Sequence, residues 1–190
     1  VSPGELQRQL GISSSLLAHH IGMLERTGFL IRMRSEADRR RTYLRLGEGA
    51  LSDLLPAARL GARRVVFVCT GNSARSQLAA ALWRSVSDVP ATSAGTHPAE
   101  RIEPGAIAAA ERHQLSLADG APRALAEVLD ADDFIVTVCD TAHEEVTDLS
   151  QLHWSVPDPV REGTDAAFDA AFDDIAQRVA ALAPRVESIP

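Results

Sequence analysis

Apolar and polar positions along the chain follow two different periods, and these periods predict its helices and strands. Ser2-Pro3-Gly4-Glu5 has the pattern of a capping box and predicts a helix over residues 3–10 that ends at Gly11. A second helix is expected after Ser13 to Ser15, ending near Gly28. Its buried face should carry apolar residues spaced three or four apart: Leu16, Leu17, Ile21 and Leu24.

Two extended segments, residues 29–33 and 39–46, come next and predict a β-hairpin. In the second segment, Thr42, Leu44 and Leu46 alternate with Tyr43 and Arg45. The order of helix, turn, helix and hairpin is typical of a small winged helix-turn-helix domain, whose second helix reads DNA. We expect duplex DNA to be contacted by the second helix and by the arginines at the hairpin tip: Ser14, Ser15, His19, Arg39, Arg40 and Arg41.

A segment rich in glycine and proline separates the predicted hairpin from the rest of the chain. Residues 47–63 contain Gly47, Gly49, Pro56 and Gly61 around one short helical stretch, so we place a linker there. The domains expected are therefore 1–46, 47–63 as linker, and 64–190. The third begins with a continuous apolar run, Val65 to Val68, which is typical of a strand buried on both faces of a parallel sheet.

Charge divides the chain at the same place. The 190 residues carry a net charge of −7, and every basic side chain is an arginine. Residues 1–64 have 11 arginines against 6 carboxylates, a net of +5, whereas residues 65–190 have 8 against 20, a net of −12. This asymmetry indicates two parts with different partners. The sequence has no apolar run long enough for a membrane span and no signal peptide, so we expect a cytoplasmic protein without membrane contact.

The strongest chemical signal follows the first strand of the third domain. Cys69 begins a Cys-x5-Arg-Ser sequence that leads into a helix expected over residues 76–86. Gly71 and Asn72 tolerate positive φ, so successive amide groups can curl inward as an anion-binding nest, and Arg75 supplies a planar fork for two oxygens. The positive field of the helix N-terminus stabilises a thiolate at Cys69. We expect a tetrahedral oxyanion to bind at Thr70, Gly71, Asn72, Ser73, Ala74 and Arg75, with Ser76 donating to the thiolate and Asn72 bracing the loop.

This loop resembles that of the low-molecular-weight protein tyrosine phosphatases and of the arsenate reductases that share their fold. The likeness extends over residues 64–185 through Ser93 to Thr96 after a second strand, a third strand from Asp133 to Cys139, and His153 to Pro159 closing a fourth. The resemblance implies an α/β fold, a four-stranded parallel sheet with helices on both faces and the loop at the carboxyl ends of the strands. It also implies that Asp158 is the general acid. We assign no chemistry to His97, His113 and His153.

Within this resemblance, four details favour the reductase over the phosphatase. Gln77 follows Arg75-Ser76 where the phosphatases usually have proline, and Val160 stands where they usually have an aromatic residue that sandwiches the phenol. Cys139 lies where many of the reductases carry a resolving thiol. The front domain, which over residues 16–46 resembles ArsR-type and more loosely MarR-type bacterial repressors, matches regulators of arsenic operons.

The source of the second thiol stays open. The residues after Cys139 include no third cysteine, which excludes the three-thiol relay of thioredoxin-linked members. Either Cys139 closes a disulfide with Cys69, or an external thiol resolves the adduct: mycothiol, a glutaredoxin-type protein or thioredoxin. We favour a small thiol, which leaves open that Cys139 is a packed residue at the end of the strand. No bound cofactor and no metal site are expected, and residues 1–46, which contain no cysteine, cannot trap arsenite by thiolates.

Each of the two domains also has an alternative function of another class. The third domain is either a reductase or a phosphatase, or it is a non-catalytic oxyanion sensor for a DNA-binding regulator. The front domain is either a DNA-binding homodimer or an accessory domain that never touches DNA. Because it is small, we expect further helices upstream of residue 1.

Overall fold

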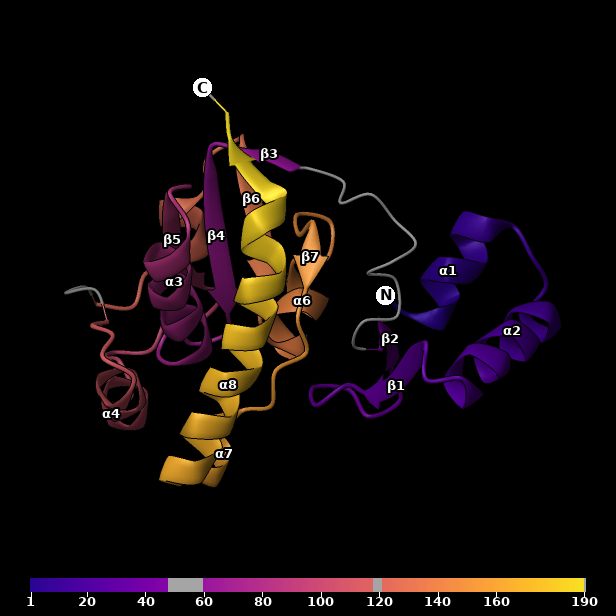
Figure 1. The fold of residues 1–190 in the computed structure, drawn as a ribbon, viewed down its shortest axis with the longest axis horizontal. Coiled ribbons are helices and arrows are strands. Elements are labelled where there is room, and N and C mark those ends of the chain that lie inside the picture. Colours follow the sequence, from indigo (N-terminus) through magenta and orange to yellow (C-terminus); the bar gives the residue numbers. More distant parts are fainter. Residues whose placement is uncertain (48–59, 118–120, 190) are drawn as a thin grey trace. The chain divides into compact units, whose positions relative to one another are not determined.

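The computed structural model describes residues 1–47, 60–117 and 121–189. The chain divides into two compact units, Val1–Ala58 and Arg59–Pro190, each of which is described by itself (Figure 1). Most of the linker expected at 47–63, residues 48–59, lies outside the described residues. In the described part of the chain, no helix combines the length and apolar character needed to cross a membrane.

The first unit contains the two helices and the hairpin that the sequence predicts. They are α1 (Pro3–Leu10), α2 (Ser14–Arg26), β1 (Leu30–Arg34) and β2 (Thr42–Leu46), with β1 and β2 antiparallel. The capping box is confirmed, because the Ser2 hydroxyl accepts from the Glu5 amide while the Glu5 carboxylate accepts from the Ser2 amide. Gly11 ends α1 with a φ of 62°, a left-handed conformation that glycine adopts without strain.

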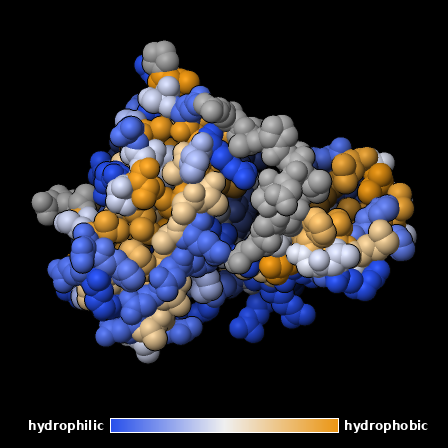
Figure 2. Space-filling model, viewed as in Figure 1, coloured by the Kyte–Doolittle hydropathy of each residue, from blue (hydrophilic) through white to orange (hydrophobic). Residues whose placement is uncertain are grey.

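The buried face of α2 is narrower than predicted. Leu17 and Ile21 pack against Leu44 of β2 in a small core, which Leu6, Ile12 and Leu30 border. Leu16 and Leu24 are instead 45% and 40% exposed, so the prediction that they are buried was wrong. The described part of this unit provides only α1 and one hairpin as neighbours for α2, and these cover one edge of its apolar face. Figure 2 shows hydrophobic residues at the surface of this unit.

The second unit is built on the four-stranded parallel sheet that the sequence predicts. Its strands lie in the order β5-β4-β6-β7: β5 (Ala91–Gly95), β4 (Arg64–Cys69), β6 (Asp133–Thr137) and β7 (Leu152–His153). A short parallel pair, β3 (Leu60–Ala62) with β8 (Val186–Ser188), joins the two ends of this unit. Strand β3 lies within the segment that the sequence analysis assigned to the linker.

Two strand boundaries differ from the prediction. Ser93, Ala94 and Gly95 lie inside β5 rather than after it, because they pair with Phe67 to Cys69 of β4. The third strand ends at Thr137 rather than at Cys139, because Cys139 caps the next helix.

Helices flank both faces of the sheet, and α3 and α8 pack against each other on one of them (Figure 1). The helices of this unit are α3 (Arg75–Val86), α4 (Pro104–Arg112), α5 (Leu125–Val128), α6 (Asp140–Glu145), α7 (Pro159–Glu162), α8 (Asp165–Leu182) and the 3-10 turn η1 (Ala183–Arg185).

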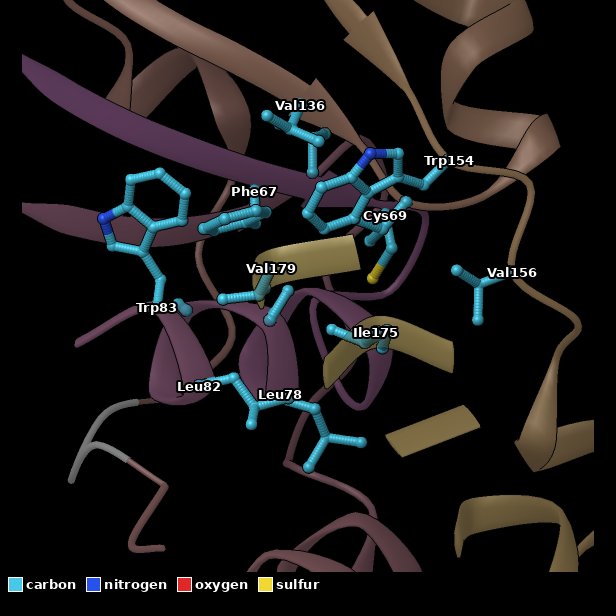
Figure 3. Packing of buried hydrophobic residues seen from close by; sticks show 14 of the residues in the cluster. Phe67, Cys69, Leu78, Leu82, Trp83, Val136, Trp154, Val156, Ile175 and Val179 are labelled. Carbon is cyan, nitrogen blue, oxygen red and sulfur yellow. The ribbon is translucent and has the colours of Figure 1, made fainter. Parts of the chain in front are cut away.

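An aromatic cluster fixes β4 against this helical layer. Phe67, fully buried, lies between Trp83 of α3 and Trp154, with ring centroids 5.8 and 5.6 Å apart (Figure 3). The Trp83 indole donates to the Val89 carbonyl at 2.8 Å, so its polar atom is satisfied inside the core. Cys69 lies at the edge of this cluster, at the end of β4, so close packing fixes the strand that carries it.

Candidate active site

Cys69 is the last residue of β4, and the loop of residues 69–75, called here the oxyanion loop, connects this strand to α3. The loop therefore lies at the carboxyl end of a central parallel strand, where open α/β sheets bind ligands. Cys69 is 2% exposed, and Arg75 is the first residue of α3. The N-cap residue, Ala74, has no side chain that could cap the helix, which leaves the first-turn amides available to an anion.

The carbonyl groups of the oxyanion loop all point away from its centre. The Cys69, Thr70, Gly71 and Ser73 carbonyls accept from the amides of Thr96, His97, Ala99 and Glu103, at 2.8 to 3.1 Å. The Asn72 carbonyl accepts from the Gln77 side chain at 3.1 Å. In a trans peptide the N–H points opposite to the carbonyl, and the described chain has no cis bond. The five amides of residues 70–74 are thus directed into the loop, as an anion-binding nest requires.

Hydrogen-bond donors converge on the Cys69 sulfur. The Asn72 amide donates to Sγ at 3.2 Å, and the Ser76 hydroxyl lies 3.0 Å from it. The Asn72 side-chain amide donates to Ser76 Oγ at 2.9 Å, which occupies a lone pair of that oxygen and leaves its hydrogen to the sulfur. The structure thus brings Ser76 and Asn72 together at the Cys69 sulfur, where both present hydrogen-bond donors.

Asn72 also fixes the path of the loop. Its φ of 48° is one of two positive values among the described non-glycine residues, and its side-chain oxygen accepts from the Arg123 amide at 2.9 Å. The Asn72 brace therefore reaches from the loop to a segment 51 residues away. Gly71 tolerates a positive φ but does not adopt one, since the described glycines with positive φ are Gly11, Gly28 and Gly163.

Arg75 and Asp158 meet at the open side of the loop. Arg75 Nη2 lies 3.2 Å from Asp158 Oδ1, and Nη1 donates to the Val156 carbonyl at 3.0 Å. Asp158 caps α7, where its carboxylate accepts from the Val160 amide. The Val156 carbonyl and the Asp158 carboxylate thus hold the Arg75 guanidinium, and they place a carboxyl group beside it. Val160 is 38% exposed.

Cys139 lies against the start of the loop. Its Sγ is 3.4 Å from Thr70 Oγ1, and it caps α6 by accepting from the Ala142 amide. Burial raises the pKa of the Cys139 thiol; the charge of Arg75 opposes this shift, and the Cys69 thiolate adds to it. Both cysteines are free and buried.

Sequence reasoning missed the residues that turn the loop carbonyls outward. They come from the strand end and turn after β5, residues 96–103, and from Gln77. Gly95 lies within the range Ser93 to Thr96 named in the sequence analysis, but its role was not predicted: a side chain there would meet the Thr70 carbonyl and the Asn72 amide. The sequence signal that could have revealed it is a glycine at the end of the strand next to β4.

The residues predicted to contact DNA lie on the surface of the first unit. Ser14, Ser15 and His19 are exposed on α2, and the three tip arginines, Arg39 to Arg41, are exposed before β2. Asp38 forms ion pairs with Arg40 at 3.0 Å and with Arg41 at 3.9 Å, so two of the three tip arginines already have an acidic neighbour. Within the described ranges, no group of three or more His, Cys, Asp or Glu side chains is arranged to hold a metal ion.

Comparisons with known proteins agree with this geometry. An arsenate reductase from Halalkalibacterium halodurans is 29% identical over 131 residues, which cover 63% of this chain and 94% of that protein. The crystal structure of an arsenate reductase from Archaeoglobus fulgidus matches with 30% identity and a TM-score of 0.56, over 63% of this chain and 98% of that one. A tyrosine phosphatase from Escherichia coli K30, crystallised with sulphate, shares the fold at 22% identity and a TM-score of 0.56, over 64% and 96%.

Residues 64–189 match the sequence model of the low molecular weight phosphotyrosine protein phosphatases. This match covers most of the second unit, including the oxyanion loop and Asp158. Together with the arsenate reductases named above, this match shows that the chain is an enzyme. The chain belongs to the low molecular weight phosphotyrosine protein phosphatase family.

Proposed function

We propose that the second unit is an arsenate reductase in which the Cys69 thiolate attacks arsenate bound in the oxyanion loop. The observation that carries the proposal is the loop itself, with five inward amides, Arg75 and a hydrogen-bonded cysteine at its base. A tetrahedral oxyanion with two or three charged oxygens fits such a nest. The curated relatives at 27–29% identity are named arsenate reductases, which supports the choice of substrate.

The reaction has two bond-exchange steps. In the first, the Cys69 sulfur forms a bond to arsenic and an arsenate oxygen leaves as water, with Asp158 in position to supply a proton to it. In the second, another thiolate attacks the Cys69 sulfur and the sulfur–arsenic bond breaks. Its electron pair stays on arsenic, so As(V) becomes As(III) while two thiols become one disulfide. Arsenite leaves, and a further thiol pair must reduce the disulfide.

Two thiols are candidates for the second step. Cys139 is the internal one, and its contact with Thr70 places it beside the loop. The external candidates are a low-molecular-weight thiol such as mycothiol, a glutaredoxin-type protein and thioredoxin. An external thiol is required in either case, because a Cys69–Cys139 disulfide must be reduced before another turnover.

The second candidate function is hydrolysis of aryl phosphates, as in a protein tyrosine phosphatase. The observation that favours it is Asp158, whose carboxyl lies 3.2 Å from the Arg75 guanidinium, so that a proton donor for a leaving phenol oxygen is close to the group that would hold the phosphate. Val160 disfavours it, because an aliphatic side chain offers no flat platform for a phenol ring. A non-catalytic oxyanion sensor is the third possibility, and any turnover of arsenate would exclude it.

For the first unit we propose duplex DNA as the partner, bound by a homodimer through α2 and the hairpin arginines. Support comes from the helix-turn-helix followed by a hairpin, and from the three exposed arginines at the hairpin tip. Residues 1–58 have 8 arginines against 6 carboxylates, a net of +2, whereas the second unit is strongly acidic. Because residues 1–46 contain no cysteine, a response to arsenic would need a sensing site outside them.

One parallel assay tests the enzymatic proposal. Purified protein is given arsenate with mycothiol, with glutathione plus glutaredoxin, or with thioredoxin plus its reductase, and arsenite is measured. The same preparation is given an aryl phosphate without a reductant. The proposal expects arsenite in at least one thiol system at a higher kcat/KM than phosphate release, and phosphate release alone would assign the phosphatase function instead.

A further inference from the structure

A buried carboxylate–imidazole pair lies directly beside Cys139. His153 Nε2 of β7 is 3.0 Å from Asp140 Oδ1, the first residue of α6, and the two side chains are 8% and 2% exposed. The other ring nitrogen, Nδ1, is 3.0 Å from Thr137 Oγ1 at the end of β6. The imidazole therefore joins the first turn of α6 to two neighbouring strands.

A second histidine reinforces this junction. The His143 ring stacks on His153 with centroids 4.0 Å apart and planes 7° from parallel. Its Nδ1 lies 3.2 Å from Thr137 Oγ1 and 3.1 Å from Ser150 Oγ. The first turn of α6 is thus held to the ends of β6 and β7 by polar contacts of defined direction, in addition to packing.

This junction determines where the Cys139 sulfur lies. Cys139 immediately precedes Asp140 and caps the same turn, so a displacement of Asp140 moves Cys139 with it. The Cys139 sulfur contacts Thr70, which follows Cys69 in the oxyanion loop. The path from the buried pair to the loop is therefore short and continuous: His153, Asp140, Cys139 and Thr70.

We propose that Asp140 and His153 are positioning residues that hold the Cys139 thiol at the oxyanion loop, so that it acts as the second thiol. The proposal rests on the proposed arsenate chemistry and assigns its second step to an internal group. Cys139 loses its proton to solvent, its sulfur bonds to Cys69, and the sulfur–arsenic bond breaks with its electron pair on arsenic. A Cys69–Cys139 disulfide and arsenite result.

A buried polar pair contributes little to stability alone. Both groups give up hydrogen bonds to water, and replacing both partners by apolar side chains of the same shape can be nearly neutral. A pair of defined hydrogen-bond direction does fix orientation, which matters for a thiol that must reach another sulfur. Its location next to a cysteine at the loop is therefore explained by positioning.

The first test oxidises the thiols without arsenate. Diamide takes two electrons and two protons from a thiol pair and becomes a hydrazine, so it forms the Cys69–Cys139 disulfide wherever the two sulfurs can meet. Its formation rate is followed by peptide mass spectrometry in the full chain, in His153→Ala and in His153→Gln. We expect a fall of about tenfold or more in His153→Ala, since misplacement by an ångström costs on the order of a hundredfold. Partial recovery is expected in His153→Gln, whose amide can still donate to Asp140.

Glu145→Gln is the matched control. Glu145 also lies on α6 and also pairs with a histidine, His97, at 3.2 Å, but that histidine is 70% exposed. This variant should form the disulfide at the unaltered rate. Urea denaturation of each variant separates positioning from unfolding, and aryl phosphate hydrolysis, which needs no second thiol, should stay within about twofold in a folded His153 variant.

The outcomes separate this inference from the proposed function. Slow disulfide formation in His153→Ala, with hydrolysis retained, supports positioning even if the protein reduces no arsenate. Equal rates in the full chain and in both His153 variants would overturn it, as would failure of the full chain to form the disulfide. If His153→Ala does not fold, a His153→Gln protein with unaltered disulfide and arsenite rates would also overturn it.

Discussion

Replacing Gly95 by alanine should damage the oxyanion loop without touching any group that reacts. Gly95 ends β5 beside Cys69, and a Cβ there would lie 2.7 Å from the Thr70 carbonyl oxygen and 3.0 Å from the Asn72 amide nitrogen. Both are backbone atoms, so no flexible side chain can move aside. The Thr70 carbonyl must retreat by roughly 0.8 Å to reach an ordinary van der Waals contact near 3.5 Å.

This displacement acts on two of the groups that form the nest. Moving the Thr70 carbonyl rotates the peptide whose N–H belongs to Gly71, and the Asn72 amide would lose its contact with the Cys69 sulfur. A shift approaching 1 Å in a reacting constellation costs on the order of a hundredfold, so we expect kcat/KM to fall about tenfold to a hundredfold. Overpacking should also lower the free energy of unfolding by about 1–3 kcal/mol.

Gly105→Ala is the matched control for the stability effect. Its Cβ would clash with the Phe168 ring, between α4 and α8, rather than with the loop. The two variants are compared by their initial rates with arsenate and with an aryl phosphate. Each rate is divided by the folded fraction from urea denaturation. Gly105→Ala should lose stability but keep its rate per folded molecule. Wild-type rates in Gly95→Ala would refute the account of how the nest is held.

Three further predictions concern other parts of the chain. Asp158→Asn should lower aryl phosphate hydrolysis by about a hundredfold to ten-thousandfold, and the second step of arsenate reduction much less, since only the former needs an acid for a leaving phenol; equal effects in stopped-flow assays would count against this role. Because burial raises the pKa of Cys139, its thiolate forms at a higher pH than that of a free cysteine. Formation of the internal disulfide should therefore accelerate with pH up to and beyond about 8.5. A rate that levels off below pH 8 would contradict this. Gel shifts with the chain's own promoter DNA should weaken steeply with salt, and Arg39→Ala with Arg40→Ala should make that slope shallower by about two units; salt-independent or absent binding would leave the first unit an accessory domain.

The oxyanion loop could be predicted from sequence because its determinants are local. Its elements are a run of buried apolar residues, a cysteine, two residues that tolerate tight turns and an arginine at the start of a helix, and all of them lie within a dozen positions. Asp158 was found by resemblance, and the ion pair with Arg75 is a contact between residues 83 positions apart. Spacing alone gives no sign of such a contact.

What the sequence did not reveal depends on packing between distant segments. The outward turn of the loop carbonyls depends on amides of residues 96–103, and amides carry no sequence signature. The sequence analysis assigned no chemistry to His153, because nothing near it in sequence indicates that Asp140 and Thr137 converge on its ring. Helical spacing likewise could not tell that Leu16 and Leu24 are exposed, since burial depends on the neighbours that a helix has.

The central claim is that Cys69, activated within the oxyanion loop and faced by Arg75, turns over arsenate. Arsenite production measured with the best thiol system, in the full chain, in Cys69→Ser and in Arg75→Lys, tests it most directly. We predict no turnover in Cys69→Ser, and at least about a hundredfold loss in Arg75→Lys, which keeps the charge but cannot grip two oxygens. Arsenite formed at the full rate by folded Cys69→Ser protein would contradict the account.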